Sequence, residues 1–199
     1  YNVGYQHFHA TGAAGGFWEM FIYGFLAVLP KIIVSYVVGL GIEFVVAQWK
    51  KEEIQEGFLV SGILIPMIVP VDCPLWILAV ATAFSVIFAK EVFGGTGMNV
   101  FNVALITRAF LFFAYPTKMS GDAVWVSGDS IFGLGQSVDG LTVATPLGAA
   151  ATSGAVPEFS WDMVTGLIPG SIGETSVIAI ALGAILLLWT GIASWKTMF

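Results

Sequence analysis

The chain has 199 residues, of which 57% are hydrophobic and 10% are charged, and its mean hydropathy is +0.90. Soluble domains carry about 25% charged residues, so this composition excludes an ordinary soluble domain and indicates an integral membrane protein. The net charge is −6, and the chain has only 7 Lys and Arg side chains, too few for a nucleic-acid-binding surface.

The opening residues are expected to form a flexible polar entry over positions 1–16. His7 and His9 stand two positions apart, so they could bind one metal only in an extended segment, and no third ligand lies nearby. A positive region followed by an apolar core, as in a signal peptide, is not present here. We expect the chain to be a fragment of a larger subunit.

The first membrane segments are expected between residues 17 and 49. Residues 17–30 are apolar, but Glu19 interrupts them and Pro30 closes them, which favours an interfacial or partial span. Residues 32–49 approach the ~20 apolar residues that a bilayer crossing needs, and a charged loop (KKEE) follows them.

Two shorter apolar runs follow at residues 57–70 and 75–88, interrupted by prolines 66, 70 and 74. They suit short tilted helices or a re-entrant pair, and either arrangement returns the chain to the side that it left. Cys73 is expected to be a small buried residue, and as the only cysteine it excludes an intrachain disulfide.

The second half begins with a glycine- and asparagine-rich connection at residues 89–102. An apolar run at 103–115, a polar interval at 117–173 and a last span at 176–194 complete it. The sequence therefore predicts an all-α integral membrane protein with about five transmembrane or partial helices in one domain, residues 1–199. Short, broken apolar segments are typical of transporter folds in which irregular backbone lines a cavity.

Lysine placement predicts the orientation. Lys50, Lys51, Lys90 and Lys196 fall on one side of this path, and Lys31 and Lys118 fall on the other. By the positive-inside rule the larger group faces the cytoplasm. The interval from residue 119 to 173 contains acids but no Lys or Arg, as expected of an exported loop. Thr145 is therefore expected outside the cytoplasm.

The first candidate site is residues 139–147 (DGLTVATPL), which contain Asp139, Thr142 and Thr145. Threonine is a good helix N-cap and proline a preferred first helical residue, so Thr145 and Pro146 can simply begin a helix. A threonine hydroxyl is also a poor nucleophile unless a base or a transferase activates it. The residues alone favour the helix start.

The second candidate site is the stretch 93–102 (FGGTGMNVFN). Its glycines allow backbone N–H groups to approach a ligand, and Asn99 and Asn102 each offer a donor and an acceptor for the edge of a planar heterocycle. A glycine-rich turn with asparagine capping explains the same residues equally well.

Glu43 and Arg108 are ionisable residues within apolar runs, where they are functional candidates because charges in lipid are unfavourable. Glu43 follows Gly39 and Gly41, whose small side chains permit close helix approach. It could bind a cation or a proton, or it could pair with Arg108 or with a lysine.

Several blocks, in order, resemble the B subunit of the sodium-translocating NADH:quinone oxidoreductase, in the family that also includes the D subunit of Rnf-type electron-transport complexes. These blocks are residues 90–97 (KEVFGGTG), 108–116 (RAFLFFAYP), 120–122 (SGD), 139–145 (DGLTVAT), 168–174 (IPGSIGE) and 191–195 (GIASW). The resemblance runs from about Tyr1 to Trp195, and the glycine–asparagine stretch is more similar to the sodium-translocating enzyme than to its Rnf counterpart.

The resemblance implies a subunit of a six-subunit respiratory complex in the bacterial inner membrane. Its fold would be one half of an inverted-repeat architecture similar to urea transporters and ammonium channels. It also implies FMN joined by a phosphoester to Thr145, the last threonine of a D-x-x-[S/T]-x-A-T pattern that includes Asp139 and Thr142. A flavin transferase outside the cytoplasm would attach it. Val143 stands where the family often has glycine.

The resemblance further implies non-covalent riboflavin, a quinone and a sodium ion. By position, it places riboflavin at Asn99 and Asn102, the quinone region near Gly39 and Gly41, and the sodium path at Glu43. The expected function is electron relay from FMN through riboflavin to quinone, coupled to outward sodium movement. A channel or transporter half without redox activity, and a membrane anchor whose loop docks partners, are the alternatives.

Overall fold

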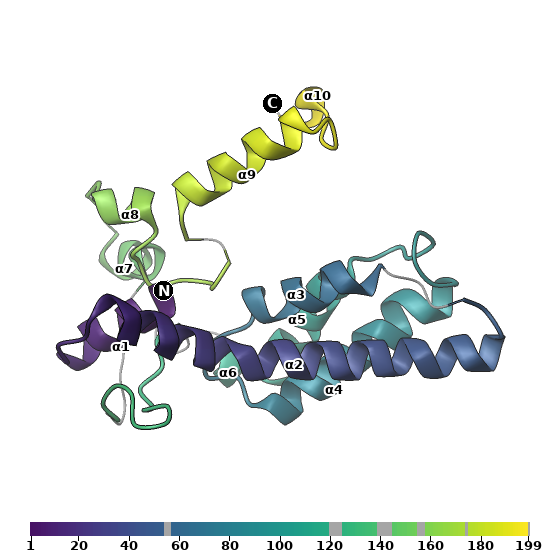
Figure 1. Ribbon diagram of the computed structural model, residues 1–199, viewed down its shortest axis with the longest axis horizontal. Helices are drawn as coiled ribbons and strands as arrows, with labels where there is room; N and C mark the ends of the chain where they lie inside the picture. The colour runs from purple at the N-terminus through teal and green to yellow at the C-terminus, as the bar shows by residue number, and fades with distance from the viewer. Residues whose placement is uncertain (54–56, 120–124, 139–144, 155–157, 174, 199) are drawn as a thin grey trace.

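The computed structural model describes residues 1–53, 57–119, 125–138, 145–154, 158–173 and 175–198, and the elements within them are helices (Figure 1). The described residues contain no strand, only an isolated bridge between Ile131 and Leu134. This confirms the all-α prediction. In chain order the helices are α1 (Asn2–Thr11), α2 (Phe17–Lys50), α3 (Phe58–Ile68), α4 (Leu75–Ser85), the π-helical turn η1 (Val86–Lys90), the 3₁₀ turn η2 (Glu91–Phe93), α5 (Val103–Ala114), α6 (Pro116–Met119), α7 (Pro146–Ser153), α8 (Trp161–Thr165), α9 (Val177–Trp189) and α10 (Trp195–Met198).

Two helical stretches are long and apolar enough to cross a membrane, namely α2 and the continuous segment Leu75–Phe93. The helices α3, α5 and α9 are apolar but shorter. Together they match the expected set of about five transmembrane or partial helices.

The expected break at Pro30 is wrong, because α2 runs through this residue as one helix of 34 residues. Proline removes one backbone donor, yet a long apolar helix tolerates this when neighbouring groups satisfy the freed carbonyls. The Lys31 ammonium donates to the Ala27 carbonyl at 3.0 Å, next to the Leu26 carbonyl that loses its backbone donor at Pro30. Glu19 does not interrupt the helix either. Its carboxylate accepts from the Gly16 N–H at 3.0 Å and so caps the first turn.

The expected flexible entry at residues 1–16 is also wrong, because α1 packs against the start of α2 (Figure 1). His7 is fully buried, its ring stacks on Tyr23, and its Nδ1 atom donates to the Ser127 carbonyl at 2.7 Å. Tyr23 donates to the Asp129 carbonyl. A helix places His7 and His9 on different faces, and His9 is exposed.

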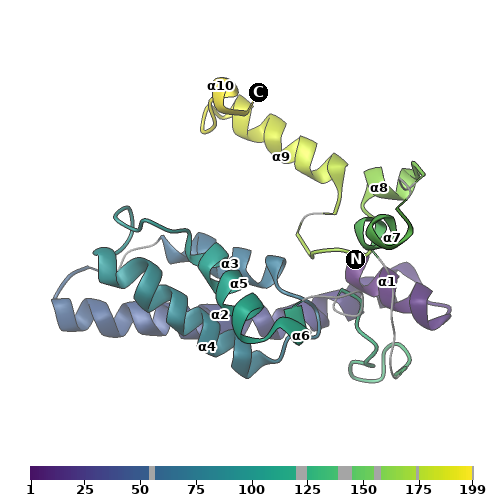
Figure 2. The ribbon, with the colours of Figure 1, turned by 180° about the vertical axis from the view of Figure 1, so that it is seen from behind.

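The core lies where α2 and α5 pack against α3 and α4, side by side in both views (Figures 1 and 2). Its buried apolar residues include Phe58, Ile65, Leu78, Ala81 and Leu111. Cys73 belongs to the same cluster, and burial raises the pKa of its thiol, in agreement with the expected buried residue.

The helix α9 stands away from this core, and none of its residues is buried (Figures 1 and 2). It spans 13 residues and so is shorter than the span expected over 176–194. Gly191 has φ 72°, a left-handed conformation that ends the run before α10. The expected loop at 117–173 contains the short helices α7 and α8.

Candidate functional site

Thr145 is the N-cap of α7, as the sequence predicts. Its backbone is extended (φ −70°, ψ 154°), its Oγ1 accepts from the Gly148 N–H at 3.0 Å, and Pro146 is the first helical residue. The cap fixes the Thr145 side chain at the end of the helix, and Gly154 in a left-handed conformation ends the helix at its other end. Asp139 and Thr142, the other two members of the motif, lie outside the described residues.

Thr145 borders a cavity of about 570 Å³, called the Thr145 cavity below. This volume falls within the range of roughly 300–1,000 Å³ that small-molecule sites occupy. The wall is mainly apolar, with one cation and one indole ring among its described members. The lining residues are Ile68, Leu105, Arg108, Trp125, Thr145, Pro146, Leu147, Ile168, Pro169, Gly170 and Ser171. Separate parts of the chain therefore meet at this site, and sequence spacing does not reveal this.

Arg108 reaches the Thr145 cavity from the middle of α5. Its Nη1 atom donates to the Ile68 carbonyl at the end of α3, and its guanidinium lies 5.5 Å from the centre of the Trp125 ring. Within the described part of the chain, the ion pairs are Lys50–Glu91 and Lys90–Glu43, so no described carboxylate neutralises Arg108. The alternative of a Glu43–Arg108 pair is wrong.

Glu43 pairs instead with Lys90, and both side chains are only 4% exposed. Lys90 ends the π-helical turn η1, where the wider turn rotates the side chain relative to a regular α-helix. Glu43 Oε1 accepts from Lys90, whereas Glu43 Oε2 is buried without a hydrogen-bond partner among the described residues. The alternative of a lysine partner for Glu43 is therefore confirmed.

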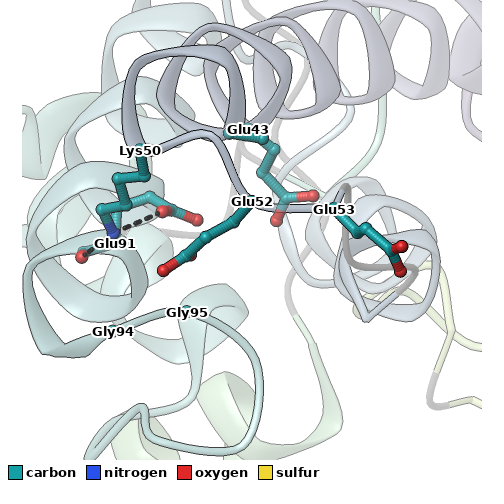
Figure 3. A pocket seen from close by; sticks show the side chains of 8 residues that line it. Glu43, Lys50, Glu52, Glu53, Glu91, Gly94 and Gly95 are labelled. Carbon is teal, nitrogen blue, oxygen red and sulfur yellow. Dashed lines mark hydrogen bonds and ion pairs between the residues drawn. The ribbon is translucent and has the colours of Figure 1, made fainter.

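Beside this pair lies a small cavity of about 20 Å³, enough for one water-sized particle (Figure 3). Its lining residues are Glu43, Ala47, Lys50, Glu52, Glu53, Glu91, Gly94 and Gly95. Two of these lining residues contact each other, since the Lys50 ammonium donates to the Glu91 carboxylate at 3.3 Å. Within the described ranges, no three acidic, histidine or cysteine side chains converge as a metal-binding group.

Asn99 and Asn102 stabilise their own turn. Asn102 is the N-cap of α5, and its Oδ1 accepts from the backbone N–H groups of Ala104 at 2.9 Å and Leu105 at 3.3 Å. Asn99 donates to the Phe101 carbonyl at 3.0 Å. The interpretation of this stretch as a capped, glycine-rich turn is confirmed. A ligand there would contact the exposed atoms of these two side chains.

Gly39 and Gly41 lie in α2 on different faces. Gly39 is buried, and a Cβ atom there would overlap the Phe58 ring of α3, so its lack of a side chain allows the two helices to meet. Gly41 faces open space, because no described atom would lie within 4 Å of a Cβ atom at this position.

This contrast predicts opposite effects of the same substitution. Gly39→Ala is expected to destabilise the protein by about 1–3 kcal/mol through overpacking against Phe58. Gly41→Ala, the matched control, is expected to be neutral or to stabilise α2 by up to ~1 kcal/mol through helix propensity. Thermal unfolding in detergent measures both, and equal shifts for the two variants would contradict this packing.

Residues 3–199 match the NQR2, RnfD, RnfE family. Three curated relatives are each named as the B subunit of Na(+)-translocating NADH-quinone reductase. The one from Chromohalobacter salexigens is 45% identical over 188 residues, covering 92% of this chain and 43% of the relative. Those from Ectopseudomonas mendocina and Azotobacter vinelandii are 44% and 43% identical over 199 residues, each covering 95% of this chain and 47% of the relative. The chain thus spans less than half the length of these relatives.

Proposed function

The chain belongs to the NQR2, RnfD, RnfE family, and from this premise we propose that it carries FMN on Thr145 as part of a membrane electron-transfer subunit. The complex would be a sodium-pumping NADH:quinone oxidoreductase of the bacterial inner membrane, with its other subunits as partners. In this role the chain relays electrons from covalent FMN through riboflavin to quinone, coupled to sodium movement. The observation that carries the proposal is the position of the Thr145 hydroxyl at the rim of a ligand-sized cavity.

The residues of the Thr145 cavity fit a flavin phosphate and ring. Thr145 supplies the hydroxyl that a phosphoester needs, Arg108 supplies a cation, and Trp125 and the prolines supply apolar surface. When bound, the flavin supplies redox chemistry. The helical cap holds Thr145 Oγ1 in place, and the apolar wall limits water around whatever occupies the cavity.

The remaining site assignments belong to the same proposal. We assign riboflavin to the exposed turn of Asn99 and Asn102, and the quinone region to the α2–α3 contact near Gly39 and Gly41. Glu43 would lie on the sodium path, because it lines the small acidic cavity and its Oε2 has no hydrogen-bond partner among the described residues (Figure 3).

We also propose that the flavin is attached outside the cytoplasm, and the positions of the lysines support this orientation. Lys50 and Lys90 lie at one end of the core, where Lys50 pairs with Glu91 of η2 and Lys90, the last residue of η1, pairs with Glu43 of α2. Lys31 lines a cavity with Asp72 and Asp129 near α1. With the Lys50 end in the cytoplasm, α7 lies on the opposite side, accessible to a flavin transferase of that compartment.

Co-expression with a flavin transferase tests the proposal. The denatured chain should give a fluorescent band under ultraviolet light on a gel, and Thr145→Ala should remove it. Thr152→Ala is the matched control, because Thr152 is an exposed threonine of the same helix. A dark band for the unsubstituted chain, or fluorescence that survives Thr145→Ala, would overturn the attachment.

A further inference from the structure

Arg108 is the one cation among the described residues that line the Thr145 cavity. It is partly buried, and it comes from α5, which the flavin-attachment motif does not include. Its two described partners are a backbone carbonyl and an indole ring, and neither carries a negative charge. Among the described residues, no negative group therefore offsets the charge of the guanidinium beside the cavity.

The partners of Arg108 hold it in place rather than neutralise it. A guanidinium has five N–H donors, and the Ile68 carbonyl accepts from one nitrogen. The centre of the Trp125 ring lies 5.5 Å from the guanidinium carbon and helps to hold the group by a cation–π contact. A planar group held in this way is suited to paired hydrogen bonds with phosphate oxygens.

The phosphate of a Thr145-linked flavin would lie at the same cavity that Arg108 lines. Its phosphorus would be bonded to Thr145 Oγ1, which the hydrogen bond from the Gly148 N–H holds in place. A phosphodiester keeps one negative charge, and within a mainly apolar wall an unpaired charge is strongly unfavourable. Arg108 is the lining residue that can neutralise it.

We propose that Arg108 binds the flavin phosphate in the Thr145 cavity and so makes this site selective for flavin nucleotides over phosphate-free flavins. The proposal rests on the flavin attachment proposed above and adds a residue that the attachment motif does not contain. Arg108 holds the phosphate next to the Thr145 hydroxyl, and Trp125 holds Arg108.

The test measures reversible binding to the full chain, purified in detergent from cells without a flavin transferase, so that Thr145 is unmodified. FMN is titrated directly, and riboflavin is titrated as a competitor of bound FMN, so that both affinities refer to the same site and not to the proposed riboflavin turn. FMN is expected to bind roughly tenfold more tightly than riboflavin, because charge-assisted hydrogen bonds reach only the phosphate. Arg108→Met should remove this preference by weakening FMN alone, whereas Arg108→Lys should keep part of it.

Lys118→Met is the matched control, because Lys118 is an exposed cation of α6 that does not line the cavity. It should leave both affinities unchanged. The proposal is overturned if the unsubstituted chain shows no FMN preference, whether both flavins bind or neither does, or if Arg108→Met keeps the preference. Covalent attachment is read separately, from gel fluorescence of the co-expressed chain, so failure of either proposal is distinguishable from failure of the other.

Discussion

Replacing Lys90 with methionine is expected to destabilise the protein by about 3–5 kcal/mol. The substitution leaves the Glu43 carboxylate, only 4% exposed, without its buried partner. Neutralising both members in Glu43→Gln/Lys90→Met should restore most of the stability, since an uncharged pair has no desolvation penalty of this size. Thermal or denaturant unfolding in detergent measures the three free energies of unfolding.

Lys50→Met is the control for this comparison. Lys50 pairs with Glu91 at 3.3 Å, but its side chain is 32% exposed, and exposed ion pairs contribute only about 0–1 kcal/mol. Both ion pairs join α2 to the segment Val86–Phe93, and the two lysines differ mainly in burial. Equal destabilisation by Lys50→Met and Lys90→Met would contradict the buried pair.

Thr145→Asn is expected to lower quinone reduction by the assembled complex at least tenfold while leaving the protein folded. Asparagine caps a helix as well as threonine does, so α7 keeps its start. It has no hydroxyl, however, and cannot form a phosphoester. Thr145→Ser keeps both the cap and the hydroxyl and should retain activity. The measurement is the rate of quinone reduction in membranes, with subunit assembly checked by co-purification.

This pair of variants also separates the two roles that the sequence gives Thr145. If the residue only begins a helix, Asn and Ser should behave alike. Full activity of Thr145→Asn in an assembled complex would favour a subunit that anchors its partners in the membrane, without redox chemistry on this residue.

Local signals predict the parts of the fold that depend on neighbouring residues. The cap at Thr145 and Pro146, the short helices α3 and α4, and the cap at Asn102 all follow from residues a few positions apart. Pro30 is misleading because a proline ends helices in water but is tolerated inside a long apolar helix. His7 looks mobile in the sequence because its partners, Tyr23 and Ser127, are distant along the chain.

In the candidate site, too, the sequence identifies single residues but not the contacts between residues that are distant along the chain. The sequence singles out Thr145 and Arg108 separately, but it does not place them in one cavity, because α5 and α7 are joined by a long polar interval. No sequence motif in this chain singles out Trp125, and its contact with Arg108 depends on the fold. The pairing of Glu43 with Lys90 depends on the π-helical turn, which has no clear sequence signal.

The most direct test of flavin attachment is the mass of the peptide that contains Thr145, from protein made with and without a flavin transferase. We expect that the transferase adds FMN minus one water, that fragmentation places this mass on Thr145, and that Thr152 in α7 stays unmodified. A Thr145 peptide of unmodified mass from protein made with active transferase would contradict the attachment, as would the same added mass on another residue.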